Sequence, residues 1–272
     1  MKKCFKIAIC QMQVEDNKER NLNKAMAMIN KAADEGAELI VLPEMFNCPY
    51  DSDKFVEYAE NKENSQSLDA VSNAALKNNV FIVAGSIPEL WDDHLYNSSF
   101  IFDGNGRIIG IHRKVHLFDI NIKNGIKFRE SDTLTAGNNV TVIGTDLIKV
   151  GVAICYDIRF PELSRSMVLD GAEMIVVPGA FNMTTGPAHW EVTMRARAID
   201  NQCYLVAASP ARNDDLSYVA YGHSMIVDPW GRILANAGYS EEIIYADIKD
   251  SVISQVRRDL PLLKNRRTDI YD

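Results

Sequence analysis

Fully apolar segments alternate with amphipathic segments along most of this chain. Residues 39–42 and 174–177 contain no polar position, which is typical of strands covered on both faces of a sheet. Apolar residues at helical spacing occur between such runs, as in residues 17–36. The pattern therefore predicts an α/β fold in which buried strands are joined by helices.

Both halves of the sequence predict the same order of elements. Each half has an apolar strand, a helix, a second strand that ends in proline, a second helix, and then short strands joined by turns. In the first half these segments are 5–13, 17–36, 39–43, 65–79 and 80–87, with a hairpin at about 103–106. In the second half they are 149–154, 161–171, 174–178, 187–202 and 204–209, with a hairpin at about 228–231. Two stacked sheets with helices on their outer faces satisfy this pattern.

The sequence of one half is also partly repeated in the other. Residues 36–46 and 171–181 share the pattern G-A-E-x-I-V-x-P-x-x-F, and seven positions between Tyr96 and Ile108 recur between Tyr221 and Ile233. A common D-x-x-G hairpin turn could produce the second match by itself. Two matched blocks in the same order favour an internal duplication. We therefore expect residues 1–272 to form one large domain with two similar halves, ending in an arm at about residues 250–272.

Charge and composition limit the class of protein. The chain has 272 residues, with 29 Lys and Arg against 37 Asp and Glu, and a formal net charge of −8. This balance argues against a protein that binds nucleic acid by neutralising phosphates. We expect the basic residues after position 250 to pack on an acidic neighbour or a second subunit. No apolar run approaches the roughly 20 residues that span a bilayer, so no membrane association is expected.

The five cysteines are odd in number, and none forms a C-x-x-C pair. This argues against a disulfide framework and against a zinc site, so we expect no metal and a cytoplasmic location. Lys2 and Lys3 precede an apolar segment, but Lys6 and Gln11 interrupt it. The segment therefore predicts a strand rather than a signal peptide.

Cys155 is the first candidate for chemistry. It ends the apolar run 150–154, and Pro161 after it suits the first turn of a helix. A side chain at such a strand-to-helix turn has the geometry of a nucleophile elbow, and a helix N-terminus lowers the pKa of a thiol. The alternative is a small core residue, the usual place of a free cysteine. We expect that core role for the other four cysteines, which are Cys4, Cys10, Cys48 and Cys203.

Two charged residues stand in comparable places. Glu44 follows the apolar strand 39–43, where burial raises the pKa of a carboxyl group and suits a general base near neutral pH. Its counterpart in the repeat is Gly179, so this acid belongs to one half only. The alternative role of Glu44 is to cap the following turn. Lys114 alternates with its neighbours in a strand-like segment, and a solvated lysine is the simpler interpretation of that position alone.

Together, the contexts of these three residues resemble the Glu-Lys-Cys triad of the nitrilase superfamily of carbon–nitrogen hydrolases. The resemblance covers essentially the whole chain and implies a four-layer α-β-β-α sandwich with an internal pseudo-twofold repeat. Segments 46–50, 114–120, 179–190 and 208–212 look specifically like the ω-amidase branch. The superfamily's usual second glutamate matches Glu130, ahead of Gly137. The resemblance further implies a homodimer, and the chemistry needs no cofactor.

The residue types suggest how such a site works. The Cys155 thiolate attacks the carbon of a primary amide, and Glu44 moves the proton and later activates water. Lys114 and the backbone N–H of Tyr156 hold the oxyanion. Glu130 orients Lys114 or the substrate amide. The substrate also needs a small apolar-aromatic pocket, for which the candidates are Tyr50, Tyr156, Phe181 and Thr185.

Structural roles are expected for several other charged residues. His116 shares a strand face with Lys114, and we expect it to give hydrogen-bonded support there. Arg159 is expected to pair with Asp157 or Glu162 as structural support, and the alternative is contact with the substrate. An ion-pair network, from which one arginine could reach a substrate carboxylate, is expected of Arg195, Arg197 and Asp200.

The resemblance implies an amidase that releases ammonia from the ω-amide of a small dicarboxylic acid monoamide, such as 2-oxoglutaramate or 2-oxosuccinamate. Two alternatives stay open. The same triad could act on a deaminated-glutathione-like amide, an N-carbamoyl compound or a nitrile, since all of these proceed through a cysteine-bound intermediate. The chain could also be a non-catalytic member that serves as an interaction scaffold, although the intact triad speaks against this.

Overall fold

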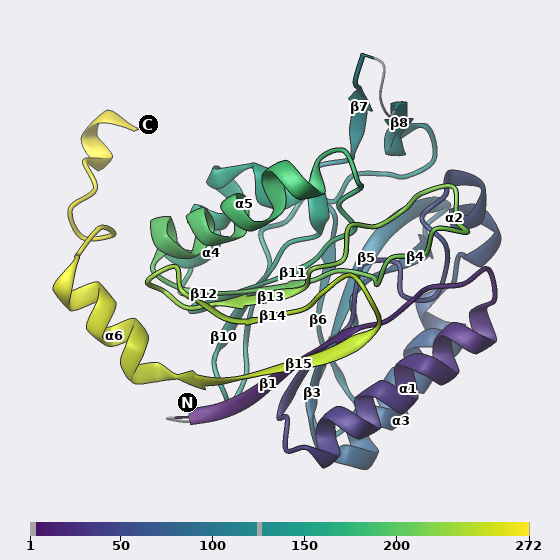
Figure 1. Cartoon of the computed structure of the whole chain (residues 1–272), viewed down its shortest axis with the longest axis horizontal. Coiled ribbons are helices and arrows are strands. Elements are labelled where there is room, and N and C mark those ends of the chain that lie inside the picture. The colour runs from purple at the N-terminus through teal and green to yellow at the C-terminus, as the bar shows by residue number, and fades with distance from the viewer. Residues whose placement is uncertain (1–3, 124–126, 272) are drawn as a thin grey trace.

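The computed structural model describes residues 4–123 and 127–271, which form four layers. Two β-sheets stack face to face, and each carries helices on its outer side (Figure 1). The order helix, sheet, sheet, helix confirms the predicted four-layer α-β-β-α sandwich. Lys2 and Lys3 lie outside the described residues.

The first sheet has the strand order β15-β1-β2-β3-β5-β4, and β6 pairs with β5 as well. Strands β1, β2 and β3 are parallel, whereas β15 and β5 run antiparallel to their neighbours. Helices α1 (Lys18–Asp34) and α3 (Gln66–Asn78) cover the outer face, and Asn17 and Ser65 cap their N-termini by accepting backbone hydrogen bonds. The strands are β1 (Cys4–Gln11), β2 (Leu39–Val41), β3 (Phe81–Val83), β4 (Ile87–Trp91), β5 (His94–Phe102), β6 (Ile108–Arg113) and β15 (Glu242–Lys249).

The second sheet repeats this plan in the order β14-β13-β12-β11-β10-β9. Its three central strands, β10 to β12, are parallel, β9 and β13 run antiparallel to them, and β14 runs antiparallel to β13. Helices α4 (Pro161–Leu169) and α5 (Gly186–Asn201) cover its outer face. The strands are β9 (Val142–Gly144), β10 (Lys149–Val152), β11 (Met174–Pro178), β12 (Tyr204–Ala208), β13 (Met225–Val227) and β14 (Ile233–Asn236).

The irregularities of the two sheets repeat as well. The pairing of β5 with β6 shifts between Ile101 and Phe102, and that of β13 with β14 shifts between Ile226 and Val227. These are equivalent positions in the second repeated block of the sequence. Because a β-bulge is a local feature tied to particular residues, its recurrence confirms the internal pseudo-twofold repeat.

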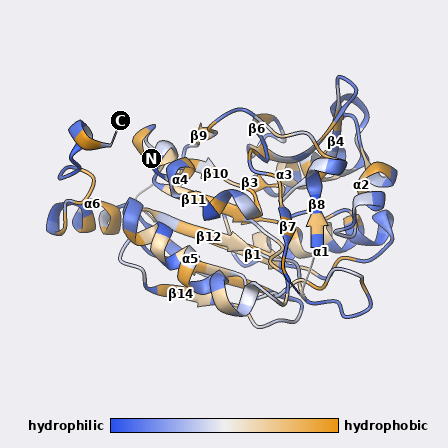
Figure 2. Cartoon of the chain, turned by 90° about the horizontal axis from the view of Figure 1, so that it is seen from above, coloured by the Kyte–Doolittle hydropathy of each residue, from blue (hydrophilic) through white to orange (hydrophobic). Residues whose placement is uncertain are grey.

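Three apolar clusters hold the layers together. One lies between the first sheet and α1 and α3, a second between the two sheets, and a third between the second sheet and α4 and α5. The central strands are coloured mainly as hydrophobic in Figure 2, and hydrophilic segments lie toward the periphery. A fourth cluster, which includes Met45, Tyr50, Phe118 and Tyr218, caps the region where β2 and β6 end.

Several elements were not predicted from the sequence. They are α2 (Ser52–Tyr58), the hairpin of β7 (Asp119–Asn121) and β8 (Lys127–Arg129), and strand β15, which pairs with β1 along its whole length. The predicted strand 80–87 is two strands, because the chain turns at Gly85. Gly85 has φ +50, and a Cβ there would lie 1.9 Å from the Pro43 carbonyl oxygen.

The C-terminal segment leaves the sandwich. Helix α6 (Asp250–Asp259) follows β15 and leads into an arm that projects from one end of the molecule (Figure 1). None of the helices within residues 4–123 and 127–271 has the length and apolar character needed to cross a membrane.

Candidate active site

Cys155 lies just beyond β10, at the start of a 3-10 helix (Cys155–Arg159) that leads into α4. Its φ is +48, in the left-handed region that residues with side chains rarely adopt. A strained residue at a strand-to-helix turn is the geometry of a nucleophile elbow. Gly179 lets this turn approach β11, since a Cβ there would lie 3.3 Å from the Cys155 Cα.

Glu44 follows β2 and is fully buried. Its Oε1 accepts a hydrogen bond from Asn97 Nδ2 at 2.9 Å, and its Oε2 accepts one from the Ala180 N–H at 2.8 Å. Asn97 belongs to the first sheet, whereas Ala180 follows the second, so the two halves meet at this carboxylate. At the equivalent position of the second half the chain has Gly179, the glycine that makes room for the Cys155 turn.

Lys114 follows β6 and is also fully buried. Its Nζ donates to Glu44 Oε1 at 3.1 Å, to Glu130 Oε1 at 2.9 Å and to the Tyr50 hydroxyl at 3.2 Å. These three acceptors match the three donors of an ammonium group. Lys114 is thus a cation held between two buried carboxylates rather than a solvated lysine.

Glu130 and Tyr50 complete this charged cluster. Glu130 starts the 3-10 helix Glu130–Asp132 and is fully buried. Its Oε1 accepts a short hydrogen bond from the Tyr50 hydroxyl, and its Oε2 accepts one from the Phe118 N–H at 2.6 Å. Tyr50 therefore contacts the charged groups directly, in addition to lining the pocket.

The Cys155 thiol and the Glu44 carboxylate are close enough for each to shift the pKa of the other. Burial raises the pKa of Cys155 well above its usual range, and the negative charge of Glu44 adds to this effect. The expectation that the turn lowers the thiol pKa is therefore wrong, because desolvation outweighs the opposing charge of Lys114. Burial also raises the pKa of Glu44 in spite of Lys114.

These protonation states prepare the cluster for proton transfer. Burial alone would lower the pKa of Lys114, but the charges of Glu130 and Glu44 outweigh it and raise the pKa. Lys114 therefore keeps its proton at neutral pH. A neutral thiol next to a carboxylate of raised pKa can give up its proton when an electrophile arrives, which is what nucleophilic catalysis requires.

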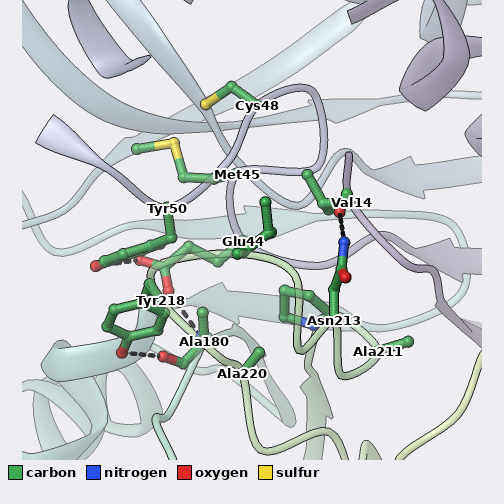
Figure 3. Close-up of a pocket in the computed structure, with 12 residues that line it drawn as sticks. Val14, Glu44, Met45, Cys48, Tyr50, Ala180, Ala211, Asn213, Tyr218 and Ala220 are labelled. Carbon is green, nitrogen blue, oxygen red and sulfur yellow. Dashed lines mark hydrogen bonds between the residues drawn. The ribbon is translucent and has the colours of Figure 1, made fainter. Parts of the chain in front are cut away.

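Aromatic side chains enclose the cluster. The Tyr50 ring lies 4.6 Å from that of Tyr218 and 5.6 Å from that of Phe128, centroid to centroid. Figure 3 shows Tyr50 and Tyr218 beside Glu44, and the Tyr218 hydroxyl donates to the Ala180 carbonyl at 2.6 Å. A small cavity with mainly apolar walls borders Glu44 at this point. Such walls exclude water and strengthen the electrostatic interactions inside.

Arg159 contacts two residues that the sequence predicts for the substrate pocket, Phe181 and Tyr156. Its guanidinium group lies 4.4 Å from the centroid of the Phe181 ring and 5.9 Å from that of Tyr156, and its Nη1 is 3.0 Å from His189 Nδ1. The expectation that Arg159 pairs with Asp157 or Glu162 is wrong. Within residues 4–123 and 127–271, Arg159 forms no ion pair, because it lies over aromatic rings and Asp157 is bound by histidines.

Thr185 is the last of the residues that the sequence predicts for the substrate pocket. The Thr185 hydroxyl donates to Asn182 Oδ1 at 3.3 Å, in the turn before α5. Asn97 and Tyr218 contact the cluster but were missed in the sequence. Asn97 stands beside Ser98 and Ser99 in β5, so nothing in the sequence singled it out, and Tyr218 lies in a loop and gave no signal either.

The expected ion-pair network of Arg195, Arg197 and Asp200 is confirmed only for Arg197 and Asp200, because Arg195 pairs with Glu191 instead. Arg195 lies 3.0 Å from Glu191, and Arg197 lies 3.5 Å from Asp200. Arg197 also donates to the carbonyl of Ile158 at 3.0 Å, which ties α5 to the 3-10 helix that begins at Cys155. Arg197 therefore supports the turn structurally, whereas Arg195 donates to the Gly231 carbonyl at 3.0 Å.

The chain is similar over nearly its whole length to known proteins. The carbon–nitrogen hydrolase family model matches residues 6–258. Omega-amidase NIT2 of Danio rerio is 46% identical over 267 residues, which cover 98% of this chain and 96% of the relative. Nitrilase homolog 2 of Dictyostelium discoideum is 47% identical over 271 residues, which cover 99% and 82%. The crystal structure of Saccharomyces cerevisiae Nit3, a member of branch 10 of the nitrilase superfamily, has a TM-score of 0.91 and 45% identity, and the match covers 98% of each chain.

Proposed function

The chain belongs to the carbon–nitrogen hydrolase family, and from this premise we propose that it is a thiol-dependent ω-amidase. Its substrates are small dicarboxylic acid monoamides such as 2-oxoglutaramate and 2-oxosuccinamate, from which it releases ammonia. Relatives named omega-amidase, at about 45% identity over almost the full length, support this choice of substrate class. The main support for the chemistry is the buried cluster in which the Cys155 thiol lies near the Glu44 carboxylate, to which Lys114 donates a hydrogen bond.

Acylation is the first half of the reaction. Glu44 accepts the thiol proton while the Cys155 sulfur attacks the amide carbon, which forms a C–S bond. Lys114 Nζ turns the N–H of its longest hydrogen bond, the one to the Tyr50 hydroxyl at 3.2 Å, toward the resulting oxyanion, and the Tyr156 backbone N–H is the second donor. Glu44 then returns the proton to the nitrogen, the C–N bond breaks, ammonia leaves, and a thioester remains on Cys155.

Hydrolysis of this thioester completes the cycle. Glu44 takes a proton from a water molecule, whose oxygen attacks the thioester carbon. The same two donors hold the second oxyanion. The C–S bond breaks, the sulfur recovers the proton from Glu44, and the free dicarboxylic acid leaves. Glu130 holds Lys114 in place during both halves, since its Oε1 binds Nζ at 2.9 Å.

The free carboxylate of the substrate requires a cation, and Arg159 supplies it. This guanidinium group has no carboxylate partner among the described residues and lies over Phe181 and Tyr156, next to the nucleophile turn. Arginine binds carboxylates through two parallel hydrogen bonds, and the rings beneath it keep the side chain in one orientation. Lys114 cannot serve both ends of the substrate, because Glu44 and Glu130 already hold it in the charged cluster.

Two further parts of the proposal concern the protein's surroundings. Helix α5 exposes Val192 and Ile199, and we propose that this face pairs with a second copy to form a homodimer. All five cysteines are free thiols, which suits a reducing cytoplasm.

Ammonia release from a panel of compounds tests this function. The panel contains 2-oxoglutaramate, 2-oxosuccinamate, a deaminated-glutathione-like amide, an N-carbamoyl acid and a nitrile, each with wild type and Cys155→Ala. We expect the highest kcat/KM on the two oxo-acid monoamides and none for the variant. Preference for another member of the panel would contradict the substrate class, and no activity on any would favour an interaction scaffold.

A further inference from the structure

Asp157 is a buried carboxylate beside the nucleophile that the mechanism above does not use. Four hydrogen bonds engage its two oxygens. Oδ1 accepts from both the backbone N–H and the ring Nδ1 of His116, each at 2.8 Å. Oδ2 accepts from the Ile154 N–H at 3.0 Å and from His112 Nε2 at 3.1 Å. A carboxylate can only accept hydrogen bonds when it is ionised, so each ring nitrogen that faces it must carry a proton.

These bonds connect the two segments that carry the catalytic groups. His112 and His116 lie two residues before and two residues after Lys114, and Ile154 directly precedes Cys155. Asp157 therefore links the segment that supplies the cation to the turn that supplies the thiol. Any shift between these segments would change the distance between Lys114 Nζ and the Cys155 sulfur.

The two histidines are themselves held in place. His112 is fully buried, and its Nδ1 lies 2.9 Å from Thr141 Oγ1. The His116 ring stacks on Phe160, with centroids 3.8 Å apart and an interplanar angle of 10°. Burial alone would raise the pKa of Asp157, but the hydrogen bonds from both histidines outweigh it and lower the pKa. The carboxylate thus remains ionised and rigidly placed at neutral pH.

The Cys155 turn needs such support because of its backbone. With φ +48, Cys155 occupies a conformation that persists only when surrounding contacts enforce it. Asp157 contributes two of these contacts: its side chain accepts from the Ile154 N–H, and its own N–H donates to the Ile154 carbonyl at 3.0 Å. The turn is therefore closed on both sides of Ile154, directly before the nucleophile.

We propose that Asp157, held by His112 and His116, is a positioning residue that keeps Cys155 in register with Lys114. This role rests on the proposed amidase chemistry, since register matters only where thiol and cation act on the same substrate carbonyl. Glu44, Lys114 and Glu130 supply the charges of the reaction, whereas the Asp157 network sets the distance between nucleophile and oxyanion donor.

The substitution Asp157→Asn tests the proposal with little change of shape. It places an amide N–H group against hydrogen-bond donors, so at least one of the four bonds is replaced by repulsion. We expect kcat for ammonia release to fall about 10²-fold, because small misplacement of catalytic groups has effects of this size, and KM to change by less than about threefold. The matched control is Asp228→Asn, at a buried aspartate that accepts backbone hydrogen bonds from Trp230 and Arg232 in a hairpin turn. This control should retain the wild-type kcat.

A second readout does not depend on the substrate. Chloroacetamide alkylates accessible thiols, and peptide mass spectrometry gives the labelling rate of Cys155 relative to Cys4, which is exposed. In Asp157→Asn we expect this ratio to fall at least about tenfold, because the thiol loses its alignment with Glu44. An increased ratio would mean that the turn has merely loosened, and it would overturn the proposal.

A pair of variants at His116 covers the case in which Asp157→Asn does not fold. His116→Ala removes the ring donor, whereas His116→Asn places an N–H donor near the position of Nδ1. We expect His116→Ala to lower kcat at least about tenfold and His116→Asn to restore most of the loss. Equal losses in both, or a folded Asp157→Asn with unchanged kcat and labelling, would overturn the positioning role. If wild type releases ammonia from no compound in the panel, the proposed function fails, and the labelling ratio still decides whether Asp157 positions Cys155.

Discussion

Replacing Lys114 by methionine removes the cation that lies between two buried carboxylates. Methionine keeps the length and most of the volume of the side chain, so the change isolates the charge. In the wild type, Lys114 Nζ lies 3.1 Å from Glu44 and 2.9 Å from Glu130, and all three side chains are fully buried. The variant leaves two carboxylates near each other without a counter-ion.

The magnitude follows from this geometry. Removing one partner of a buried ion pair destabilises a protein by about 3–5 kcal/mol, and we expect a loss of this size near neutral pH. The folded variant can reduce the cost by binding a proton between the two carboxylates, which the unfolded chain does not bind above the ordinary glutamate pKa. The folded state then holds more protons than the unfolded state, so stability falls as pH rises, by about 1.4 kcal/mol per pH unit for one proton. The free energy of unfolding of the variant should therefore fall by about 2–3 kcal/mol between about pH 5.5 and about pH 7.5.

Urea denaturation at the two pH values measures this dependence, and ammonia release measures the loss of the oxyanion donor, expected to be at least about 10²-fold in kcat. Lys54→Met is the matched control. Lys54 also contacts two carboxylates, Asp16 at 2.9 Å and Glu57 at 2.8 Å, but on the protein surface. Water replaces such an ion pair readily, so the control should change neither stability nor activity appreciably.

Two results would show that Lys114 does not have this role. A loss of less than about 1 kcal/mol near neutral pH would mean that Lys114 does not compensate the buried carboxylates. A variant with the same pH dependence of stability as the wild type would mean that neither carboxylate takes up a proton when the cation is removed. In either case the charged cluster would have to be reinterpreted.

Three further predictions follow from the same site. Arg159→Met should raise KM for oxo-acid monoamides about 10–100-fold, which corresponds to the loss of a charge-assisted hydrogen bond. KM of this variant for a neutral amide should not change, and the control variant Arg195→Met should keep the wild-type KM for the monoamides. An equal rise in KM on the neutral amide would contradict carboxylate binding by Arg159. The acid limb of kcat/KM should lie above the ordinary glutamate pKa of 4.5, because burial raises the pKa of Glu44 and activity requires its ionised form. A limb at or below that value in a pH–rate profile would exclude Glu44 as the base. Gly179→Ala places a Cβ 3.3 Å from the Cys155 Cα and 3.4 Å from Trp190 Cζ3. Thermal unfolding should therefore show a free energy of unfolding lower by about 1–3 kcal/mol, and kcat should fall as well. Wild-type values in both assays would show that the turn adapts.

Much of the sandwich could be predicted because its signals are local or repeated. Strand β11 matches its predicted bounds, and helix α3 begins and ends beside the capping residues Ser65 and Asn79. The repeated blocks of sequence also reappear as matching bulges in the two sheets. Strand β15 was missed because its pairing with β1 joins the two ends of the chain, and no local pattern records a partner so distant.

In the site, too, some residues could be predicted from local sequence and others could not. Cys155, Glu44 and Gly179 stand out in the sequence because each interrupts or ends an apolar strand. The environment of Arg159 could not be read in this way, since its neighbours include both Asp157 and Glu162, and only the fold shows that it lies over Phe181 instead. The direction of the thiol pKa was also mispredicted. Local position suggested the effect of a helix terminus, whereas burial among carboxylates, a tertiary property, decides the result.

Trapping the thioester on Cys155 would show whether amide hydrolysis proceeds through this covalent intermediate. The enzyme is mixed with 2-oxoglutaramate, quenched with acid during turnover, digested and examined by mass spectrometry. We expect the peptide containing Cys155 to carry the acyl group of the substrate, and the adduct to form and decay at rates compatible with turnover. Cys155→Ala should show neither adduct nor ammonia release. Ammonia release by Cys155→Ala at a rate near that of the wild type would show that hydrolysis does not proceed through a thioester on Cys155.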